Sequence, residues 1–247
     1  MTAPSTGVSR ADLHIHTMAS DGTASVSQVL ARAEEVGLDI IAITDHDRID
    51  AAEAAKQMAI ANNLRVQVVV GEEISTLQGH LLGLFLRERV RPLRSLRRTI
   101  AEVHEQGGIA IPAHPLFPHP LCAQEGAIRA AATDRDPACR PDGLETYNPT
   151  IFGTSPRRRV ARLAADLGLA TLGSSDAHVL SAIGRVWTTF PGSSPEALRE
   201  APDIGNAFRV SSLVKGGAEA VGGVVVARSG ANAQAVIDAV KAFRRSS

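Results

Sequence analysis

Three features of the sequence predict an α/β protein built from parallel β-strands and intervening helices. Short apolar runs alternate with amphipathic segments along most of the chain, as they do in βαβ units. Several apolar runs end abruptly in histidine and acidic residues, which is typical of strands whose carboxyl ends carry functional groups. The chain has 247 residues, a length that fits a single α/β barrel domain.

The predicted strands and helices follow one another in regular order. We expect strands at residues 11–17, 38–47, 65–75, 80–86, 109–115, 143–148, 169–178 and 185–190. Helices are predicted at residues 23–37, 50–63, 91–108, 121–132, 155–168 and 232–245. Ser25 is a suitable N-cap for the first helix, and Gly37 is a suitable end for it.

The chain is expected to form one domain with distinct terminal segments. Residues 1–10 are small and polar, and we predict that they are flexible. Residues 11–247 form the domain, in which residues 115–142 are predicted to be an insertion that covers the site. Residues 203–247 are a C-terminal extension, and its part at 203–231 is rich in Gly and Ser and carries no assigned element.

The composition narrows the possible classes of protein. The 26 basic residues balance the 26 acidic residues, so nothing indicates bulk attraction to long nucleic acids or membranes. No stretch approaches the ~20 apolar residues of a membrane span, and the N-terminus lacks the apolar region of a signal peptide. We therefore expect a cytoplasmic protein without a membrane partner, and the oligomeric state is left open.

Cys122 and Cys139 are the two cysteines of the chain. Neither belongs to a CxxC pair, so neither predicts a zinc knuckle or a redox motif. Free thiols are expected in a cytoplasmic protein, with a disulfide between the two as the alternative.

Histidines gather at the ends of the predicted strands. Six of the eight lie there or immediately beside them: His14, His16, His46, His80, His114 and His178. A single histidine in such a place is ordinarily structural, but six in the same context predict a metal site. Imidazole together with carboxylate suits Zn, Mn or Fe. The remaining histidine in a helix, His104, is expected to be a surface or structural residue.

The spacing of these residues indicates more than one ion. Side chains repeat every two residues in a strand, so His14 and His16 share a face and can grip one ion, and Asp176 and His178 form a similar pair. Asp21 lies in a tight Ser-Asp-Gly turn. The nine candidate ligands, which also include Glu73 after a strand, are too many for one ion with an open position and predict two or three divalent ions.

Five segments, taken in order, resemble the PHP (polymerase and histidinol phosphatase) family. They are LHIHTMASDG, ITDHD, GEEIST followed by GHLLGL, IPAHP and GSSDAH, and they run from about residue 11 to residue 190. The resemblance implies a distorted seven-stranded (β/α)7 TIM-like barrel, the PHP fold, with a trinuclear metal site. It also selects Glu73 over Glu72 as the carboxylate that bridges two ions.

The resemblance further implies how the ligands divide among the ions. The first ion would be held by His14, His16, Glu73 and Asp176. Glu73 would bridge to a second ion held by His80 and His114. The third ion would be held by Asp21, His46 and His178. Asp21 stands where some histidinol phosphatases carry a histidine, which favours the broader phosphoesterase branch of the family.

The function implied is hydrolysis of a phosphomonoester, either a small phosphorylated metabolite or a nucleotide, by a metal-bound hydroxide. Paired ions about 3.5–4 Å apart clamp the attacking and leaving oxygens in such reactions. Asp21 or His178 is expected to assist proton transfer, and Arg185, Asn148 and His119 are candidates for contacting the substrate.

Two other functions remain open from the sequence. One is a nuclease or cyclic-phosphate phosphodiesterase that uses the same site. The other is a non-catalytic PHP module, which the complete set of nine ligands disfavours.

Overall fold

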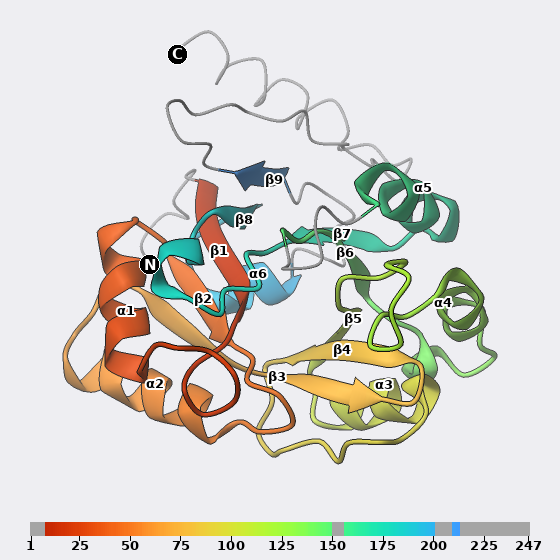
Figure 1. Cartoon of the computed structure of the whole chain (residues 1–247), viewed down its shortest axis with the longest axis horizontal. Coiled ribbons are helices and arrows are strands. Elements are labelled where there is room, and N and C mark those ends of the chain that lie inside the picture. Colours follow the sequence, from red (N-terminus) through yellow and green to blue (C-terminus); the bar gives the residue numbers. More distant parts are fainter. Residues whose placement is uncertain (1–7, 150–155, 201–208, 213–247) are drawn as a thin grey trace, which may run out of the picture.

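The structure, a computed structural model, describes residues 8–149, 156–200 and 209–212. The strands of these residues form a seven-stranded mixed sheet and a two-stranded parallel sheet (Figure 1). The large sheet has the order β5-β4-β3-β2-β1-β8-β9. Its strands are β1 (Val8–Ile15), β2 (Ile40–Ile43), β3 (Gln67–Thr76), β4 (Gly79–Leu84), β5 (Ile109–Pro112), β8 (Val186–Pro191) and β9 (Arg209–Ser212). The small sheet pairs β6 (Gly143–Tyr147) with β7 (Ala170–Gly173).

Five of the predicted helices are present within a few residues of their expected bounds. They are α1 (Val26–Glu35), α2 (Asp50–Ala61), α3 (Leu96–Glu105), α4 (Glu125–Ala132) and α5 (Arg157–Leu167). The short helix α6 (Pro195–Glu200) was not predicted. Ser25 caps α1 as expected, because its side chain accepts from Gln28 N while the Gln28 side chain accepts from Ser25 N.

The large sheet departs from the expected barrel of parallel strands. β1, β2 and β3 are parallel, whereas the pairs β3–β4, β4–β5 and β1–β8 are antiparallel. Only Leu77 and Gln78 separate β3 from β4, and a parallel crossover needs a dozen or more residues. The α/β class is therefore correct, but a count of seven parallel βα units is not confirmed.

The small sheet lies between the two sides of the curled large sheet. On one side, Asp142 N donates to Ala110 O (2.9 Å), and Ala110 N donates to the Asp142 carboxylate (2.7 Å). On the other side, the Thr188 hydroxyl of β8 accepts from Gly173 N (3.0 Å) and donates to Gly173 O (2.8 Å). These contacts connect β6 with β5 and β7 with β8, so the strands surround a common interior.

Alternate residues of the strands divide between two cores. Ile41 and Ile43 pack in a core shared with Leu30 of α1 and Ala55 of α2. The alternate residues of the same strands pack in a second core, which includes Leu13, Ile40, Ala42, Val69, Leu82 and Phe190. This period of two explains why β2 is apolar along its whole length: both of its faces are buried.

Both terminal segments differ in part from expectation. β1 begins at Val8, so residues 8–10, which were predicted to be flexible, pair with β8 through Val8↔Pro191 and Arg10↔Thr189. The C-terminal extension contributes β9 to the sheet beside β8. Residues 1–7 and the helix predicted at 232–245 lie outside the described residues.

The insertion at residues 115–142 is built into the body of the molecule. Ile128 of α4 packs in a small core with Leu144 of β6 and with Val160 and Leu163 of α5. The two cysteines, Cys122 and Cys139, are buried free thiols, as predicted. Within the described residues, no helix has the length and apolar character needed to cross a membrane.

His104 fastens α3 to the segment that precedes β6. Its ring nitrogens lie 2.8 Å from Ala138 O and 2.9 Å from the Asp142 carboxylate. The hydrogen bond with Asp142 raises the pKa of His104 above its ordinary value, although burial opposes the shift. This placement agrees with the structural role expected from the sequence.

We predict that stability depends on pH through this pair. Because the pKa of His104 is raised in the folded state, its stabilisation is fully present below the unfolded pKa of about 6.5 and is lost as pH rises through the folded pKa. Urea unfolding of the wild type and of His104→Gln, from about pH 6 to about pH 9, should show a stability difference that shrinks with rising pH. A difference that stays constant over this range would contradict the assignment.

Candidate metal centre

The nine predicted ligands meet at one edge of the curled sheet. They come from the carboxyl ends of β1, β2, β3, β5 and β7 and from the start of β4, which is antiparallel and therefore begins at this edge. The donor atoms of eight of them form three groups, each with all atoms within 4.8 Å of one another, and the ninth, His114, contacts Glu73. The groups are His14, His16, Glu73 and Asp176; then His46, Glu73 and His80; then His16, Asp21, His46 and His178.

Glu73 lies at the centre of the cluster, and its two carboxylate oxygens face different histidines. Oε2 is 3.0 Å from His14 Nε2 and 3.1 Å from His16 Nε2. Oε1 is 2.8 Å from His80 Nδ1 and 2.8 Å from His114 Nε2. A carboxylate in this position can contribute one oxygen to each of two neighbouring ions, as expected for the bridge.

Two buried polar atoms of the first group lack hydrogen-bond partners. His16 Nε2 and Asp176 Oδ1 are 3.2 Å apart, yet neither makes a hydrogen bond with any described residue. Orphaned buried atoms of this kind are rare in folded proteins. A cation shared by an imidazole nitrogen and a carboxylate oxygen would satisfy both atoms, so these residues fit a divalent metal ion.

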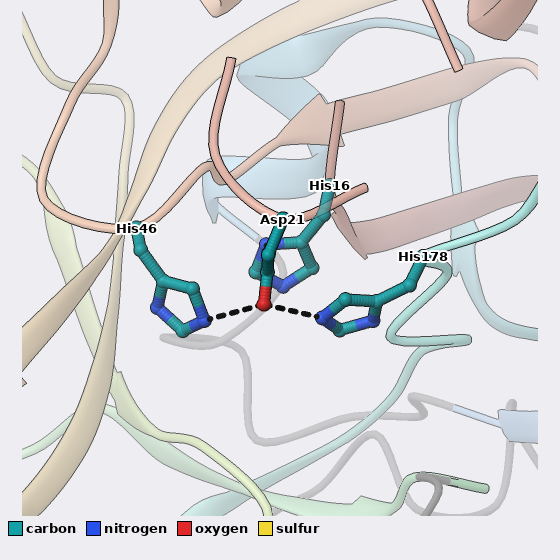
Figure 2. Close-up of side chains that lie close together, drawn as sticks. All are labelled: His16, Asp21, His46 and His178. Carbon is teal, nitrogen blue, oxygen red and sulfur yellow. Dashed lines mark hydrogen bonds and ion pairs between the residues drawn. The ribbon is translucent and has the colours of Figure 1, made fainter. Parts of the chain in front are cut away.

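The third group is more open to solvent. Figure 2 shows the Asp21 carboxylate between the rings of His46 and His178, with Oδ2 at 3.5 Å and 3.2 Å from their Nε2 atoms. The other oxygen of Asp21 lies 3.3 Å from His16 Nδ1. The Asp21 side chain is 51% exposed, whereas Glu73 is 1% exposed. The cluster thus runs from a buried floor, formed by His14, His16, Glu73 and Asp176, to an open mouth, formed by Asp21, His46 and His178.

Mutual charge pairing dominates the electrostatics of the floor. Burial alone would lower the pKa of His14, but the carboxylates of Asp176, Glu73 and Glu145 outweigh it and raise the pKa well above the ordinary value. Burial would likewise raise the pKa of Asp176, yet the neighbouring rings of His14 and His16 hold it below its usual range. Divalent ions would displace the histidine protons and would then balance the negative charge of the carboxylates.

The turn that carries Asp21 is anchored to the end of β2. Asp45 accepts from Thr17 N (2.7 Å), from the Thr17 hydroxyl (2.7 Å) and from the Ser20 hydroxyl (2.6 Å). A Cβ atom on Gly22 would come within 2.5 Å of His16 O, so only glycine fits this close turn. Asp45 therefore fixes the path of the chain between His16 and Asp21.

Two candidate ligands have unusual backbone conformations. His114 has φ of 30° and Asp176 has φ of 49°, values that side-chain-bearing residues rarely adopt. Strain of this kind persists where surrounding contacts fix the conformation, and it is common at functional sites. The strand predicted at 169–178 ends at Gly173, so Asp176 and His178 are not a same-face strand pair. They nevertheless belong to two neighbouring groups of the cluster. His178 Nδ1 donates a hydrogen bond to Asp176 O (3.0 Å).

The motifs that form this centre match a known family. The model of the PHP domain matches residues 12–116, and a PHP-associated model matches residues 154–205. An uncharacterized protein of Methanocaldococcus jannaschii is 35% identical over 150 residues, which cover 56% of this chain and 81% of that protein. The chain belongs to the PHP family. The resemblance seen in the sequence is thereby confirmed.

Other similar proteins act on different phosphate esters. The 5′-3′ exoribonuclease Rnm of Salmonella typhimurium is 33% identical over 124 residues, or 49% of this chain and 42% of the enzyme. A phosphoribosyl 1,2-cyclic phosphate 1,2-diphosphodiesterase of Eggerthella lenta is 36% identical over 91 residues, 34% of each chain. The PHP chain thus spans less than half the length of these two enzymes.

A solved structure shares the fold of this PHP protein. It is a two-domain protein of Bacteroides vulgatus that contains a predicted PHP-like metal-dependent phosphoesterase. The TM-score is 0.66 at 20% identity, over 80% of this chain and 63% of the other. The match supports the α/β fold with a curled sheet.

The residues predicted to contact substrate occupy three different settings. Arg185 is exposed, and its guanidinium donates to Ser181 O (2.8 Å), beyond His178 in the chain. His119 is half-buried in the loop after His114, and its Nδ1 accepts from Leu121 N (3.3 Å).

Asn148 is fully buried, unlike a typical substrate contact at the mouth. Its Nδ2 donates to Glu145 (2.8 Å) and to Asp176 Oδ2 (3.2 Å). This placement favours orientation of Asp176 over contact with substrate. Glu145 itself was not among the predicted site residues, because its only signal was an acid within an otherwise apolar strand pattern.

We predict that Glu73→Gln loses metal while Glu72→Gln does not. The amide introduced at position 73 would place an NH₂ group against two imidazoles, so the variant should retain only about one ion per chain. Glu72 is also buried, but it accepts from Val90 N (2.8 Å), and burial raises its pKa to about 7, so an amide is tolerated there. Metal analysis after dialysis measures the difference. Equal metal content in the two variants would remove Glu73 from the bridging position.

Proposed function

We propose that this PHP protein hydrolyses phosphomonoesters of small metabolites or nucleotides with two or three divalent ions, Mn, Fe or Zn. The observation that carries the proposal is the division of the Glu73 carboxylate between two pairs of histidines. Such a bridge supports two adjacent ions, the arrangement used for in-line displacement at phosphorus.

The proposed division of ligands agrees with the donor-atom groups for the first and third ions; around the second, the group contains His46 with Glu73 and His80, and His114 contacts Glu73 Oε1. His14, His16 and Asp176 would hold one ion with Glu73, and His80 and His114 would hold the second. Asp21, His46 and His178 would hold the third. The contacts of His16 and His46 with two groups each suggest that these two rings set the spacing between neighbouring ions. When bound, the ions would stabilise the charge on the phosphoryl oxygens and ease deprotonation of the attacking water.

The residues of the mouth are suited to proton transfer. Asp21 is half exposed, and its close contact with the His16 ring holds its pKa well below the usual range, so it is an anion suited to orienting a proton-carrying side chain. The His178 ring is held by the hydrogen bond from Nδ1 to Asp176 O, which directs Nε2 toward Asp21. We propose that His178, oriented by the Asp21 carboxylate, donates the proton that the leaving oxygen needs.

The depth of the cluster favours a terminal phosphate. Its floor is buried, and only the group around Asp21 is open to solvent. A phosphomonoester presents a phosphate at the end of the molecule, which fits such a gradient better than a phosphate within a chain. The equal numbers of acidic and basic residues also give no general attraction to long nucleic acids.

A second candidate is cleavage of phosphodiesters, as a nuclease or cyclic-phosphate phosphodiesterase. The similarity to the exoribonuclease and to the cyclic-phosphate diphosphodiesterase favours it. The same ion-binding groups would serve either reaction, so the walls of the mouth would decide between them. The loop that contains His119 lies beside β4, because His80 N donates to Leu121 O (2.9 Å). We propose this loop and Arg185 as the residues that select the substrate.

We predict that His14→Ala and Asp176→Ala each lower the hydrolysis of p-nitrophenyl phosphate by at least about a hundredfold, because each removes a proposed ligand. His104→Ala is the matched control, since it removes a histidine that lies outside the cluster and should retain activity. Circular dichroism verifies the fold of each variant. Activity unchanged in both His14→Ala and Asp176→Ala would refute the mechanism.

A substrate comparison separates the two candidate reactions. The Mn-, Fe- and Zn-loaded protein would be assayed with p-nitrophenyl phosphate, bis(p-nitrophenyl) phosphate, a mononucleotide, a nucleoside bisphosphate and a short 5′-phosphorylated RNA. We expect inorganic phosphate from the monoesters and little cleavage of the diester. Rapid shortening of the RNA with no turnover of the monoesters would instead establish the phosphodiesterase.

A further inference from the structure

Glu145 of β6 lies beneath the metal centre and was not among the predicted ligands. It is 0% exposed. Its Oε1 is 3.1 Å from His14 Nδ1 and also accepts from the Ser174 hydroxyl. Its Oε2 accepts from the main-chain nitrogen of His114 (2.7 Å) and from Asn148 Nδ2 (2.8 Å).

Three of the four groups around this side chain donate to it, and the fourth is His14 Nδ1, which donates or accepts according to its tautomer. The main-chain nitrogen of His114 can only donate, and Asn148 Nδ2 is identified as nitrogen because it also faces the Asp176 carboxylate. An ionised carboxylate only accepts, so it satisfies all four neighbours at once. A glutamine side chain in place of Glu145 would turn its NH₂ group toward two of these donors.

These contacts determine which nitrogen of His14 carries a proton. Because Glu145 accepts from Nδ1, this nitrogen keeps its hydrogen, and Nε2 is the atom left to bind an ion. His14 Nε2 is also the atom that faces Glu73 Oε2 (3.0 Å) and Asp176 Oδ1 (3.2 Å). The outer hydrogen bond and the proposed ligand position are therefore on opposite sides of one ring.

The same carboxylate reaches the other side of the Glu73 bridge. It holds the main chain of His114 at the residue whose φ is 30°, and through Asn148 it contacts the carboxylate of Asp176. We propose that Glu145 is a positioning residue that sets the tautomer of His14 and the backbone of His114, and so shapes both ion positions bridged by Glu73. The inference rests on the proposed function only through the identity of the centre as a metal site.

Asp142 provides a matched control three residues earlier in the chain. Its carboxylate accepts from a histidine, His104 Nε2 (2.9 Å), and from a main-chain nitrogen, Ala110 N (2.7 Å). It therefore repeats the arrangement of Glu145 with a histidine that lies outside the cluster. Asp142→Asn should weaken the fold without changing the metal centre.

The test measures Zn²⁺ binding to the full chain by calorimetry and by metal analysis after dialysis. Glu145→Gln should lower the affinity of the ions by about 10–100-fold, whereas Asp142→Asn should bind Zn²⁺ as the wild type does. A purely structural role of Glu145 predicts instead that both variants lose thermal stability and retain Zn²⁺ affinity. Wild-type affinity in folded Glu145→Gln would overturn the proposal.

A second measurement uses only the wild-type protein, so it does not depend on the folding of a variant. Long-range ¹H–¹⁵N correlation spectra of the Zn²⁺-loaded protein should show His14 with its proton on Nδ1. A proton on Nε2 would overturn the proposal even if Glu145→Gln failed to fold. Neither experiment contains a phosphate ester, so a wild type that binds Zn²⁺ but hydrolyses no ester would refute the proposed function alone.

Discussion

The buried carboxylate of Glu73 and the four imidazoles around it constrain the rest of the fold. An ionised carboxylate removed from water is costly unless charged or hydrogen-bonding partners surround it. Removing one partner of a buried ion pair costs about 3–5 kcal/mol, so the partners of Glu73 must be delivered together. They come from β1, from β4 and from the segment after β5, and the sheet must curl to bring these strand ends within 3.1 Å of one side chain.

The antiparallel hairpin of β3 and β4 brings one of these partners, His80, to Glu73. In its register Glu73 pairs with Leu82 and Ser75 pairs with His80. Glu73 and His80 are therefore diagonal neighbours on one face of the hairpin, close enough for long side chains to touch. A parallel crossover would have placed the start of this strand at the opposite edge of the sheet, away from the cluster. The departure from a regular parallel barrel thus serves the site directly.

The residues outside the ligand set show how the cluster is held rigid. Asp45 fixes the turn before Asp21, and Glu145 holds His14 and the main chain of His114. Each of these two buried acids accepts several hydrogen bonds at once. The mouth of the cluster is less enclosed, because Asp21 is half exposed. Many hydrogen bonds around the buried residues and an accessible Asp21 would suit firm ion binding together with exchange of substrate.

Local signals in the sequence were sufficient for the α/β class, the family and most of the helices, and they predicted candidate ligands that the structure brings together. These signals are apolar periodicity, the Ser25 cap, and histidines and acids placed where apolar runs end. The choice of Glu73 over Glu72 came from the motif, and the structure places Glu72 on the other side, bonded to Val90.

The mixed sheet, the placement of Asn148 and the part played by Glu145 emerged only from the packing of distant segments. The direction of β4 follows from its antiparallel pairing with β3 across a connection of two residues, which is too short for a parallel crossover. Apart from the bond that joins them to each other, Asn148 and Glu145 acquire their partners from segments 28 to 131 residues away in the chain. No local pattern encodes such contacts, because hydrogen-bond partners in a buried network are set by how distant strand ends converge.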